Sequence, residues 1–341
     1  MLTPLFNPHI GGVETHVEEV SKRLAKMGYE VTVVTSRFSP DLESEEEIKG
    51  FRLLRVGPDI ARSILTIASK NDLSRTGIVQ VHDYSVFFKW LMPLTPLVPK
   101  QRIFITFHGY EGTCPPSPRA MRMRAIAESK SKGNMIVGAY IHKWYGTFPT
   151  MVSYGGTSPV GTGLHKDLLR AVFVGRLERD TSLRKYLEAL RMMRNEEGFS
   201  YHLDVCGNGS MMKELRDFSV AEKLDVSFHG FVRDAAGFYE RAGVAFVPGY
   251  LSILEAMSHG CIPVATFDNP LKNDYYQLLP FRRLLSISET PEEIYRQLIN
   301  LLGDRKRMVK RMKMARAFAS NRTWDKVVMA YIRLWGLEES G

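Results

Sequence analysis

The sequence lacks most of the motifs that identify a catalytic chemistry on their own. Its three cysteines, Cys114, Cys206 and Cys261, form no C-x-x-C pair, which excludes a disulfide framework and is typical of reduced thiols in a cytoplasmic protein. Asp-x-Asp is absent, and with it the carboxylate pair that commonly holds a metal ion against a diphosphate. The G-x-x-x-x-G-K-[ST], G-x-S-x-G and H-E-x-x-H motifs are absent too. We therefore expect no metal site and no bound cofactor.

Long apolar runs are also missing. The longest, Val86–Val98, is interrupted by Lys89 and by prolines, and it is too short to span a bilayer. Charged and turn residues break the apolar stretch within the first 15 positions, so a signal peptide is not expected. Hydrophobic residues make up 44% and charged residues 24% of the chain, which is a globular composition. The net charge of +9 favours an acidic partner such as phosphate or an anionic membrane, whereas no nucleic-acid-binding motif is present.

Strand-like and helix-like segments alternate along the whole chain, beginning with an expected strand at Met1–Leu5. In residues 13–27, for example, apolar positions recur every three or four residues, as in a helix. Such alternation predicts parallel sheets with right-handed crossovers. Glycines crowd residues 155–163, which we interpret as a linker, and the pattern then restarts. The 341 residues therefore predict an α/β fold of two Rossmann-like, doubly wound domains, residues 1–166 and 167–321.

Glycines and histidines at strand ends indicate where the first domain could bind a ligand. Gly11 and Gly12 precede a helix, so the backbone can approach a phosphate closely at the helix N-terminus; an ordinary tight turn is an equal alternative. His108 follows the run Ile103–Phe107, and open α/β sheets bind ligands at the carboxyl ends of their strands. Taken alone, His108 is more often a capped surface histidine, and His82 is a weaker case of the same kind.

The second half contains comparable positions. Arg176 follows a strand and could hold a diphosphate through two hydrogen bonds, unless it merely pairs with Glu178 on the surface. Gly207 lies in another strand–glycine–helix junction. Glu255, near the first turn of a helix, is placed to accept ribose hydroxyls, although an average surface glutamate has no such role. Residues 268–274 form an expected polar loop that could line a site but is by default only solvated.

Taken together and in order, these segments resemble family 4 of the retaining glycosyltransferases, which have the GT-B fold. The resemblance covers nearly the whole chain and runs through "GGVETHVEEVSKRLAKMGYEVTVVT", "TFHG", "FVGRLE", "GNGSMMKEL", "VSFHGFV" and "ILEAMSHGCIPVA". It implies two domains that face each other across a cleft, and a last helix, residues 322–341, that crosses back onto the N-terminal domain. The N-terminal domain would bind the acceptor and the C-terminal domain the nucleotide-sugar donor.

The resemblance also implies roles for individual residues. Its catalytic set would be His108, Arg176 and Glu255. Its donor-binding set would be Gly11, Gly12, Arg176, Gly207, Val232, Ser252 and Glu255. Gly12 and Arg176 would contact the diphosphate, His108 would approach the transferred sugar, and Glu255 would bind the ribose. Val232 would lie beside the base.

The chain departs from the family pattern at two places. A Lys-Gly pair usually follows G-R-L, but Thr181 and Ser182 stand there. The nearby candidates to replace the lysine are Arg179, Arg184 and Lys185. Val247 stands where the first glutamate of Glu-x7-Glu belongs, and the usual loop around it is missing; Lys272 and Asp274 are candidates to reach the same space. Because that glutamate contacts the donor sugar in the family, its absence puts sugar selectivity and turnover in question.

The resulting expectation is a glycosyltransferase that moves a sugar from a UDP- or GDP-type donor to a hydroxyl acceptor without a metal. Retention of configuration is implied by the family alone. One alternative is a nucleotide-sugar 2-epimerase of the same fold, which would need no acceptor. Another is a sugar-nucleotide-binding protein without catalysis, for which the two departures argue.

A membrane-facing surface is the last expectation. Phe87, Phe88 and Trp90 lie among aliphatic residues, flanked by Lys89, Lys100 and Arg102. Residues 119–132 of the same domain add five cations: Arg119, Arg122, Arg124, Lys130 and Lys132. Aromatics beside cations form an interfacial anchor for anionic lipid, which would place the protein at the inner face of the membrane, near a lipid-linked acceptor. The alternative is that the aromatics belong to a core helix, which is the commoner arrangement. Residues 304–320 form a second basic segment.

Overall fold

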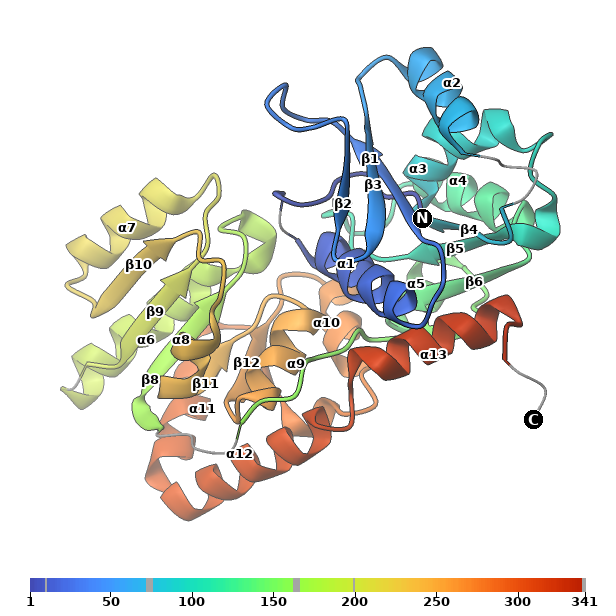
Figure 1. Cartoon of the computed structure of the whole chain (residues 1–341). Helices are drawn as coiled ribbons and strands as arrows, with labels where there is room; N and C mark the ends of the chain where they lie inside the picture. Colours follow the sequence, from blue (N-terminus) through green and yellow to red (C-terminus); the bar gives the residue numbers. More distant parts are fainter. Residues whose placement is uncertain (10, 72–75, 162–165, 199, 339–341) are drawn as a thin grey trace. The chain divides into compact units, whose positions relative to one another are not determined.

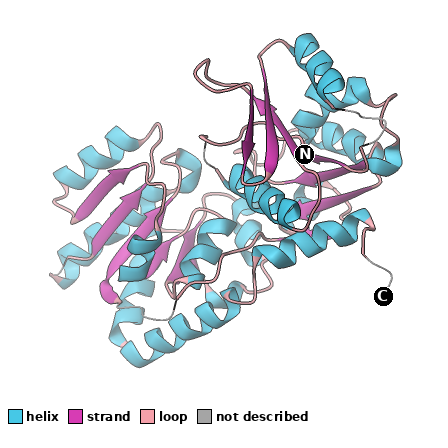
Figure 2. Cartoon of the chain, viewed as in Figure 1, coloured by secondary structure: helices cyan, strands magenta, loops and turns pink. Residues whose placement is uncertain are grey.

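In the computed structural model, the chain forms two compact units of mixed α/β structure (Figure 1, Figure 2). Unit 1 comprises Met1–Tyr154 together with Trp324–Gly341, and unit 2 comprises Gly155–Thr323. The structure describes residues 1–9, 11–71, 76–161, 166–198 and 200–338. The first boundary follows residue 154 rather than residue 166, and the chain returns to unit 1 at residue 324 rather than 322. Gly163 of the expected linker lies outside the described residues.

The strands of unit 1 form two groups, ordered β1-β3-β2 and β4-β5-β6-β7. They are β1 (Thr32–Ser36), β2 (Glu45–Ile48), β3 (Phe51–Val56), β4 (Val79–His82), β5 (Ile103–Phe107), β6 (Gly133–Val137) and β7 (Met151–Ser153). Leu2 forms parallel bridges with Val34 of β1 and with Val81 of β4, so the start of the chain lies between the two groups. Of these strands, β2 runs antiparallel to β3 and the others pair in parallel.

The first strand is much shorter than the predicted Met1–Leu5. Leu2 donates to Gln80 O at 2.8 Å and Thr3 donates to Val34 O at 3.0 Å, but Pro4 has no N–H to continue the ladder. The short segment around Leu2 nevertheless lies between β1 and β4. The chain first builds β1 and β3 on one side of this segment and then crosses to build β4 to β7 on the other side, so the strand order reverses here. This reversal is a topological switch point, where an open α/β sheet binds its ligand.

The helices of unit 1 include one from the far end of the chain. They are α1 (Gly12–Lys26), α2 (Ile60–Lys70), α3 (Tyr84–Val86), η1 (Phe87–Leu91), η2 (Met92–Leu94), η3 (Lys100–Arg102), α4 (Pro118–Ser129), α5 (Tyr140–Tyr145) and α13 (Trp324–Trp335). Helix α13 packs against α1, β6 and β7 (Figure 1). It buries Trp324, Tyr331 and Trp335. The predicted return of the last helix onto the N-terminal domain is therefore confirmed.

Unit 2 is built on one parallel sheet of order β10-β9-β8-β11-β12-β13. Its strands are β8 (Asp167–Val174), β9 (His202–Cys206), β10 (Val226–Gly230), β11 (Ala242–Phe246), β12 (Ile262–Thr266) and β13 (Ser286–Ser288). Counted from β8, the order is 3-2-1-4-5-6, the doubly wound arrangement with its switch point between β8 and β11. The predicted pair of Rossmann-like domains is thus confirmed.

Helices cover the sheet of unit 2 on both faces (Figure 2). They are η4 (Arg179–Thr181), α6 (Leu183–Glu197), α7 (Met212–Ala221), α8 (Ala236–Arg241), α9 (Tyr250–Ser258), α10 (Pro270–Gln277), η5 (Arg282–Leu284), α11 (Pro291–Gly303) and α12 (Arg305–Ala319). The polar loop predicted at residues 268–274 is wrong for most of its length. Asn269 accepts the Lys272 N–H at 2.9 Å and Pro270 occupies the first turn, so a capped helix, α10, begins there.

Candidate functional site

The switch point of unit 2 brings Arg176 to the carboxyl end of the sheet. Arg176 lies two residues beyond β8, and its side chain is 61% exposed. Its Nη2 pairs with Asp180 Oδ2 at 3.0 Å, whereas Glu178, the partner considered from the sequence, binds Ser210 N and Oγ. Exposed ion pairs of this kind contribute little to stability, so the guanidinium can turn toward an anion at low cost.

The connection from β11 to α9 has only three residues, Val247, Pro248 and Gly249. Val247 is fully buried, so the position of the family's first glutamate belongs to the core. Ser252 caps α9: its Oγ accepts from Gly249 N at 3.2 Å and donates to Gly249 O at 2.8 Å. Glu255 is half-buried and lies in the second turn of α9, whereas the sequence predicts a place near the first turn.

The side chain of Lys272 reaches this short connection from α10. Its Nζ donates to Pro248 O at 2.9 Å and lies 4.5 Å from the centre of the Tyr275 ring. The pKa of Lys272 is lowered to about 8, mainly by burial; Arg176 also lowers it, and the carboxylates of Asp180 and Asp268 oppose the shift. Of the two residues proposed from the sequence, Lys272 therefore reaches the connection. Asp274, two positions later, lies on a different face of the same helix.

The residues after Arg176 are already engaged within unit 2. Ser182, which stands where the family pattern has glycine, adopts a left-handed backbone with φ of 55°, and its Oγ donates to Asp268 at 2.6 Å. Lys185 donates to two backbone carbonyls, at 2.7 and 2.8 Å. Arg184 Nε pairs with Glu188 Oε1 at 2.9 Å, and the guanidinium lies over the Phe218 ring. Arg179 is exposed on η4.

Gly207 is required by the close approach of two strand ends. Its φ is 155°, and a Cβ at this position would lie 1.8 Å from Gly175 O. The backbone beside Arg176 therefore packs directly against the end of β9, with a hydrogen bond of 3.1 Å from Gly175 N to Cys206 O. Val232 is half-buried and follows β10, the edge strand of the sheet. Its place beside a base stays a prediction.

A carboxylate lies over the glycine pair in unit 1. Gly11 is the N-cap of α1 and Gly12 its first residue. A Cβ on Gly11 would come within 2.5 Å of Glu14 Oε2, and Glu14 Oε1 lies 2.9 Å from His9 Nδ1. Glu14 thus occupies the place that an anion would use at this helix N-terminus, and a phosphate would have to displace it.

Three histidines meet at the switch point of unit 1. They are His16 on α1, His82 at the end of β4 and His108 just beyond β5. The ring centre of His108 lies 4.9 Å from that of His16, and His108 Nε2 lies 2.8 Å from His82 Nδ1. Burial lowers the pKa of all three, that of His108 to about 3, so they are neutral at physiological pH. His16 is not among the residues predicted from the sequence, and its only signal there is its position one turn after Gly12 on the same helix.

Buried charges fix the backbone around His108. Asp83 has φ of 73°, an unusual value for a residue other than glycine, and its Oδ1 accepts the His108 N–H at 3.1 Å. Burial raises the pKa of Asp83, while the guanidinium of Arg124 opposes that rise. Arg124 is 1% exposed and pairs with Glu111 at 2.7 Å. Asp83 and Glu111 carry no sequence motif that would have predicted their place in this site.

The expected aromatic membrane anchor is wrong. Phe87 and Trp90 are fully buried in unit 1, so the core alternative holds for them. Arg124, one of the cations that the anchor needed, is buried as well. Across the part of the chain that the structure describes, no helix has both the length and the apolar character needed to cross a bilayer.

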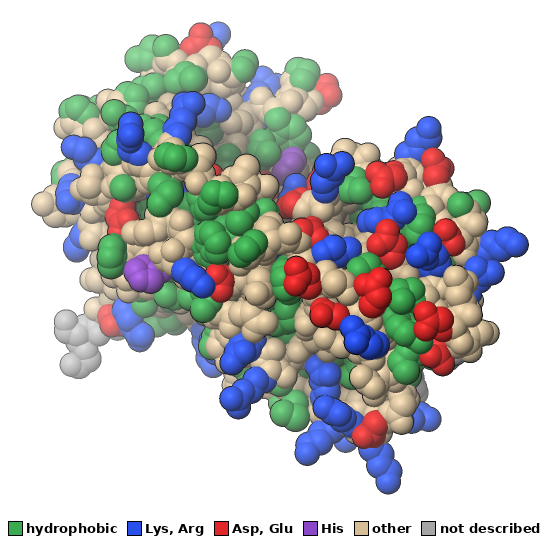
Figure 3. Space-filling model, turned by 180° about the vertical axis from the view of Figure 1, so that it is seen from behind, with side chains coloured by type: hydrophobic (Ala, Val, Ile, Leu, Met, Phe, Trp, Pro, Cys, Tyr) green, Lys and Arg blue, Asp and Glu red, His purple; other side chains and the backbone are tan. Residues whose placement is uncertain are grey.

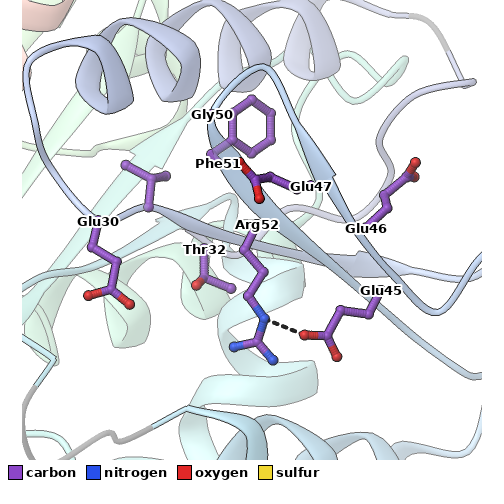
Figure 4. Close-up of a pocket in the computed structure, with 9 residues that line it drawn as sticks. Glu30, Thr32, Glu45, Glu46, Glu47, Gly50, Phe51 and Arg52 are labelled. Atoms are coloured by element: carbon purple, nitrogen blue, oxygen red, sulfur yellow. Dashed lines mark hydrogen bonds and ion pairs between the residues drawn. The ribbon is translucent and has the colours of Figure 1, made fainter.

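A pocket of about 360 Å³ lies beside the edge strand β2 (Figure 4). It is lined by Glu30, Val31, Thr32, Glu45, Glu46, Glu47, Gly50, Phe51 and Arg52. Arg52 Nε donates to Glu45 Oε1 at 2.6 Å, as Figure 4 shows, and Glu46 pairs with Arg55. Since no predicted site residue lines this pocket, and Glu45 and Glu46 already have cationic partners, it is not the candidate site.

Two family models match the chain, one in each unit. Residues 10–147 match Glycosyltransferase Family 4, and residues 169–304 match Glycosyl transferases group 1. Both halves of the chain are glycosyltransferase domains. The first match contains the histidine cluster, and the second contains Arg176, Glu255 and Lys272.

Solved glycosyltransferase structures share this two-domain architecture. Sucrose-phosphate synthase from Thermosynechococcus elongatus is 14% identical with a TM-score of 0.73, over 98% of this chain and 97% of that one. A glycosyltransferase from Rickettsia africae is 13% identical with a TM-score of 0.71, over 99% and 98%. HepE from Anabaena, in complex with UDP and glucose, is 12% identical with a TM-score of 0.70, over 97% of each chain. At these identities the likeness shows the fold, which is GT-B. No curated protein sequence matches this chain.

Proposed function

We propose that this glycosyltransferase takes its sugar from a nucleoside-diphosphate sugar bound at the switch point of unit 2. One observation carries the proposal: the exposed guanidinium of Arg176, just beyond β8, lies near enough to the Lys272 ammonium to lower the pKa of that lysine, and Lys272 is held at Pro248, just beyond β11. Two neighbouring cations at a ligand-binding sheet edge are stabilised when an anion lies between them. A diphosphate has the charge and the size to do this.

Each cation has a distinct part in the proposed reaction. Arg176 offers a planar pair of N–H groups that suits phosphate oxygens, and Lys272 supplies the second positive charge that the family pattern places at Thr181. The acceptor hydroxyl oxygen bonds to the anomeric carbon as the bond from that carbon to the diphosphate oxygen breaks, and the departing diphosphate oxygen takes the hydroxyl proton. The bonding electrons leave with the nucleoside diphosphate, and the two cations stabilise its developing charge.

The other proposed site residues surround the nucleotide and the sugar. Glu255 accepts the ribose hydroxyls, and Gly207 and Val232 border the nucleotide. Ser252 contributes by shaping the first turn of α9, where its hydroxyl forms the cap. In unit 1, His108 contacts the transferred sugar. Gly11 and Gly12 contact phosphate only if Glu14 moves aside.

The proposed donor is a UDP-sugar, with a GDP-sugar as the second choice. HepE, which has this fold, is known in complexes with UDP and glucose and with UDP-glucose. We propose that no metal takes part, because the cations of the chain replace it and the sequence offers no Asp-x-Asp pair. The proposal that configuration is retained rests on the family pattern.

Donor binding and turnover can be tested separately. A thermal-shift screen of UDP- and GDP-sugars should identify the donor, since a ligand at about a hundred times its Kd adds about 2.7 kcal/mol of stability. Release of nucleoside diphosphate is then measured in EDTA, with and without a panel of hydroxyl acceptors. Release that depends on an acceptor supports the proposal.

Three other results would contradict it in distinct ways. Conversion of the donor without any acceptor would indicate an epimerase. Saturable donor binding without release across the acceptor panel would indicate a binding protein. Activity lost in EDTA and restored by magnesium would overturn the metal-independent part alone.

A further inference from the structure

The hydrogen bond between His82 and His108 constrains where each proton lies. His82 Nδ1 and His108 Nε2 are 2.8 Å apart, so one nitrogen donates an N–H and the other accepts with a lone pair. Both rings are neutral near pH 7, because burial lowers both pKa values. Each ring therefore carries one proton, and two arrangements are available.

The surroundings of His82 distinguish the two arrangements. His82 is 0% exposed, and its Nε2 has no hydrogen-bond partner among the described residues. If His108 donated, the single proton of His82 would lie on that buried Nε2 with nothing to accept it. If His82 donates from Nδ1, only a lone pair is left unpaired. Buried N–H groups without an acceptor are rarer than under-satisfied acceptors, so the second arrangement is favoured.

We propose that His82 is a positioning residue that holds His108 in the Nδ1–H tautomer, so that His108 acts as a hydrogen-bond donor to a ligand oxygen. His108 then has its basic nitrogen occupied by His82 and its N–H turned to the other side of the ring. Its Nδ1 makes no hydrogen bond to any described residue, and the side chain is half-buried at the ligand-binding end of β5.

The tautomer assigns a chemistry to His108. Its free nitrogen donates and its accepting nitrogen is blocked, so His108 is not a general base for the acceptor. A sugar hydroxyl oxygen is the matching ligand, and this identification alone rests on the proposed function. Asp83, which fixes the His108 backbone at 3.1 Å, and His16, whose ring packs edge-on at 4.9 Å, hold the ring in place.

Nitrogen NMR of the protein labelled with 15N-histidine tests the tautomer without substrate or turnover. Protonated and unprotonated imidazole nitrogens have well-separated shifts, and His108→Gln assigns the signals. We expect His108 to show a protonated Nδ1 and an unprotonated Nε2 at pH 7. A protonated Nε2 would overturn the inference even in an active enzyme, whereas the expected tautomer in a protein without transferase activity would contradict the proposed function alone.

Substitutions of His82 test its positioning role. His82→Asn keeps an N–H near the Nδ1 position and should preserve the His108 tautomer, whereas His82→Leu should let the Nε2–H form of His108 appear. With a donor identified, His82→Leu should lower kcat/KM at least tenfold, and His82→Asn should restore most of it. His142→Leu, on a histidine whose Nδ1 contacts Thr147 O in the same unit, is the control. Equal behaviour of the two His82 variants in folded protein would overturn the positioning role.

Discussion

Trp335 donates its indole N–H to Gln80 Oε1 at 3.0 Å, across 255 positions of sequence. Gln80 in turn donates to Thr106 Oγ1 at 3.0 Å, and Thr106 shares a hydrogen bond of 2.8 Å with Tyr331 OH. Tyr331 OH also lies 2.9 Å from His16 Nε2. This buried chain of hydrogen bonds joins the last helix to β4, β5 and the histidine cluster, so α13 supports the ligand-binding end of unit 1.

The substitution Trp335→Phe should destabilise the protein beyond the loss of ring area. It leaves Gln80 Oε1 buried without its partner, which costs about 1–3 kcal/mol. Trp324→Phe on the same helix is the matched control, because that indole forms no hydrogen bond with a described residue. Urea unfolding followed by circular dichroism should show a larger loss for Trp335→Phe. Equal losses would mean that the hydrogen bond adds nothing to ring packing.

The helix α13 could be predicted from sequence because its signal is local. Apolar residues recur at helical spacing from Trp324 to Trp335, and the structure places a helix at those residues. The strands of unit 2 other than β13 could be predicted for the same reason, since buried strands of a parallel sheet are short apolar runs between turn residues. Strand β13, Ser286–Ser288, has no such apolar run. Pro4 shortened the first strand through its missing N–H, which apolar character alone did not reveal.

The contacts at the candidate sites could not be predicted in this way. Lys272 on α10 reaches Pro248 in the connection after β11, and His82 at the end of β4 meets His108 just beyond β5. Both contacts depend on the order of the strands in the sheet. The composition of the segment with Phe87 and Trp90 fits a membrane anchor and a core segment equally well. Only its packing decides between the two, and the packing buries both rings.

Removing the guanidinium of Arg176 should weaken donor binding far more than stability. A hydrogen bond to a charged group contributes about 1.5–3 kcal/mol, so the donor KM or Kd should rise roughly 10- to 150-fold in Arg176→Ala. The unfolding midpoint should barely change, because the side chain is exposed and its ion pair with Asp180 is weak.

The control for Arg176 is another arginine in an ion pair on the same unit. Arg191 lies on α6, with Nη1 3.7 Å from Glu222 Oε1. Arg191→Ala should leave donor binding unchanged, as measured by titration of the folded variants with the donor found in the thermal-shift screen. Unchanged donor binding in Arg176→Ala would remove Arg176 from the donor site.

Lys272 should give donor binding a pH dependence in the alkaline range. A lysine carries its charge below its pKa, which burial lowers to about 8 here. The donor KM should therefore rise as pH increases through about 8, and Lys272→Met should show a high KM that no longer changes in this range. The exposed Lys213, substituted to Met, is the control. The same pH profile in wild type and Lys272→Met would exclude Lys272 from the donor site.

The same lowered pKa predicts the opposite trend for stability. The folded protein releases the Lys272 proton near pH 8, whereas the unfolded chain keeps it up to the ordinary lysine value of 10.5. The unfolded state therefore binds more protons between these values, and the contribution of Lys272 to stability rises with pH there. The stability of wild type relative to Lys272→Met should increase across that interval in urea unfolding.

The exposed face of α12 should bind anionic membranes. This helix, Arg305–Ala319, contains seven cations and no acidic residue, and its exposed side chains include Val309 and Met314. Figure 3 shows Lys and Arg side chains gathered at the lower edge of the molecule, where α12 lies. Each cation near an anionic surface contributes about 1 kcal/mol to membrane binding. At 0.1 M salt this attraction is largely screened beyond about 10 Å, so binding should weaken as the salt concentration rises.

Co-sedimentation with vesicles tests this face, and two variants of equal net charge make the test specific. Lys306→Glu, Lys310→Glu and Lys313→Glu together reverse three charges on α12; Lys26→Glu, Lys130→Glu and Lys213→Glu reverse three exposed charges elsewhere. We expect wild type to bind phosphatidylglycerol vesicles but not phosphatidylcholine vesicles, less so at high salt. The α12 variant should lose most of this binding and the control variant should keep most of it, because cations beside exposed Val309 and Met314 can approach the headgroups together. Equal losses in both variants would show that only net charge matters, and no binding by wild type would exclude a membrane-facing role for α12.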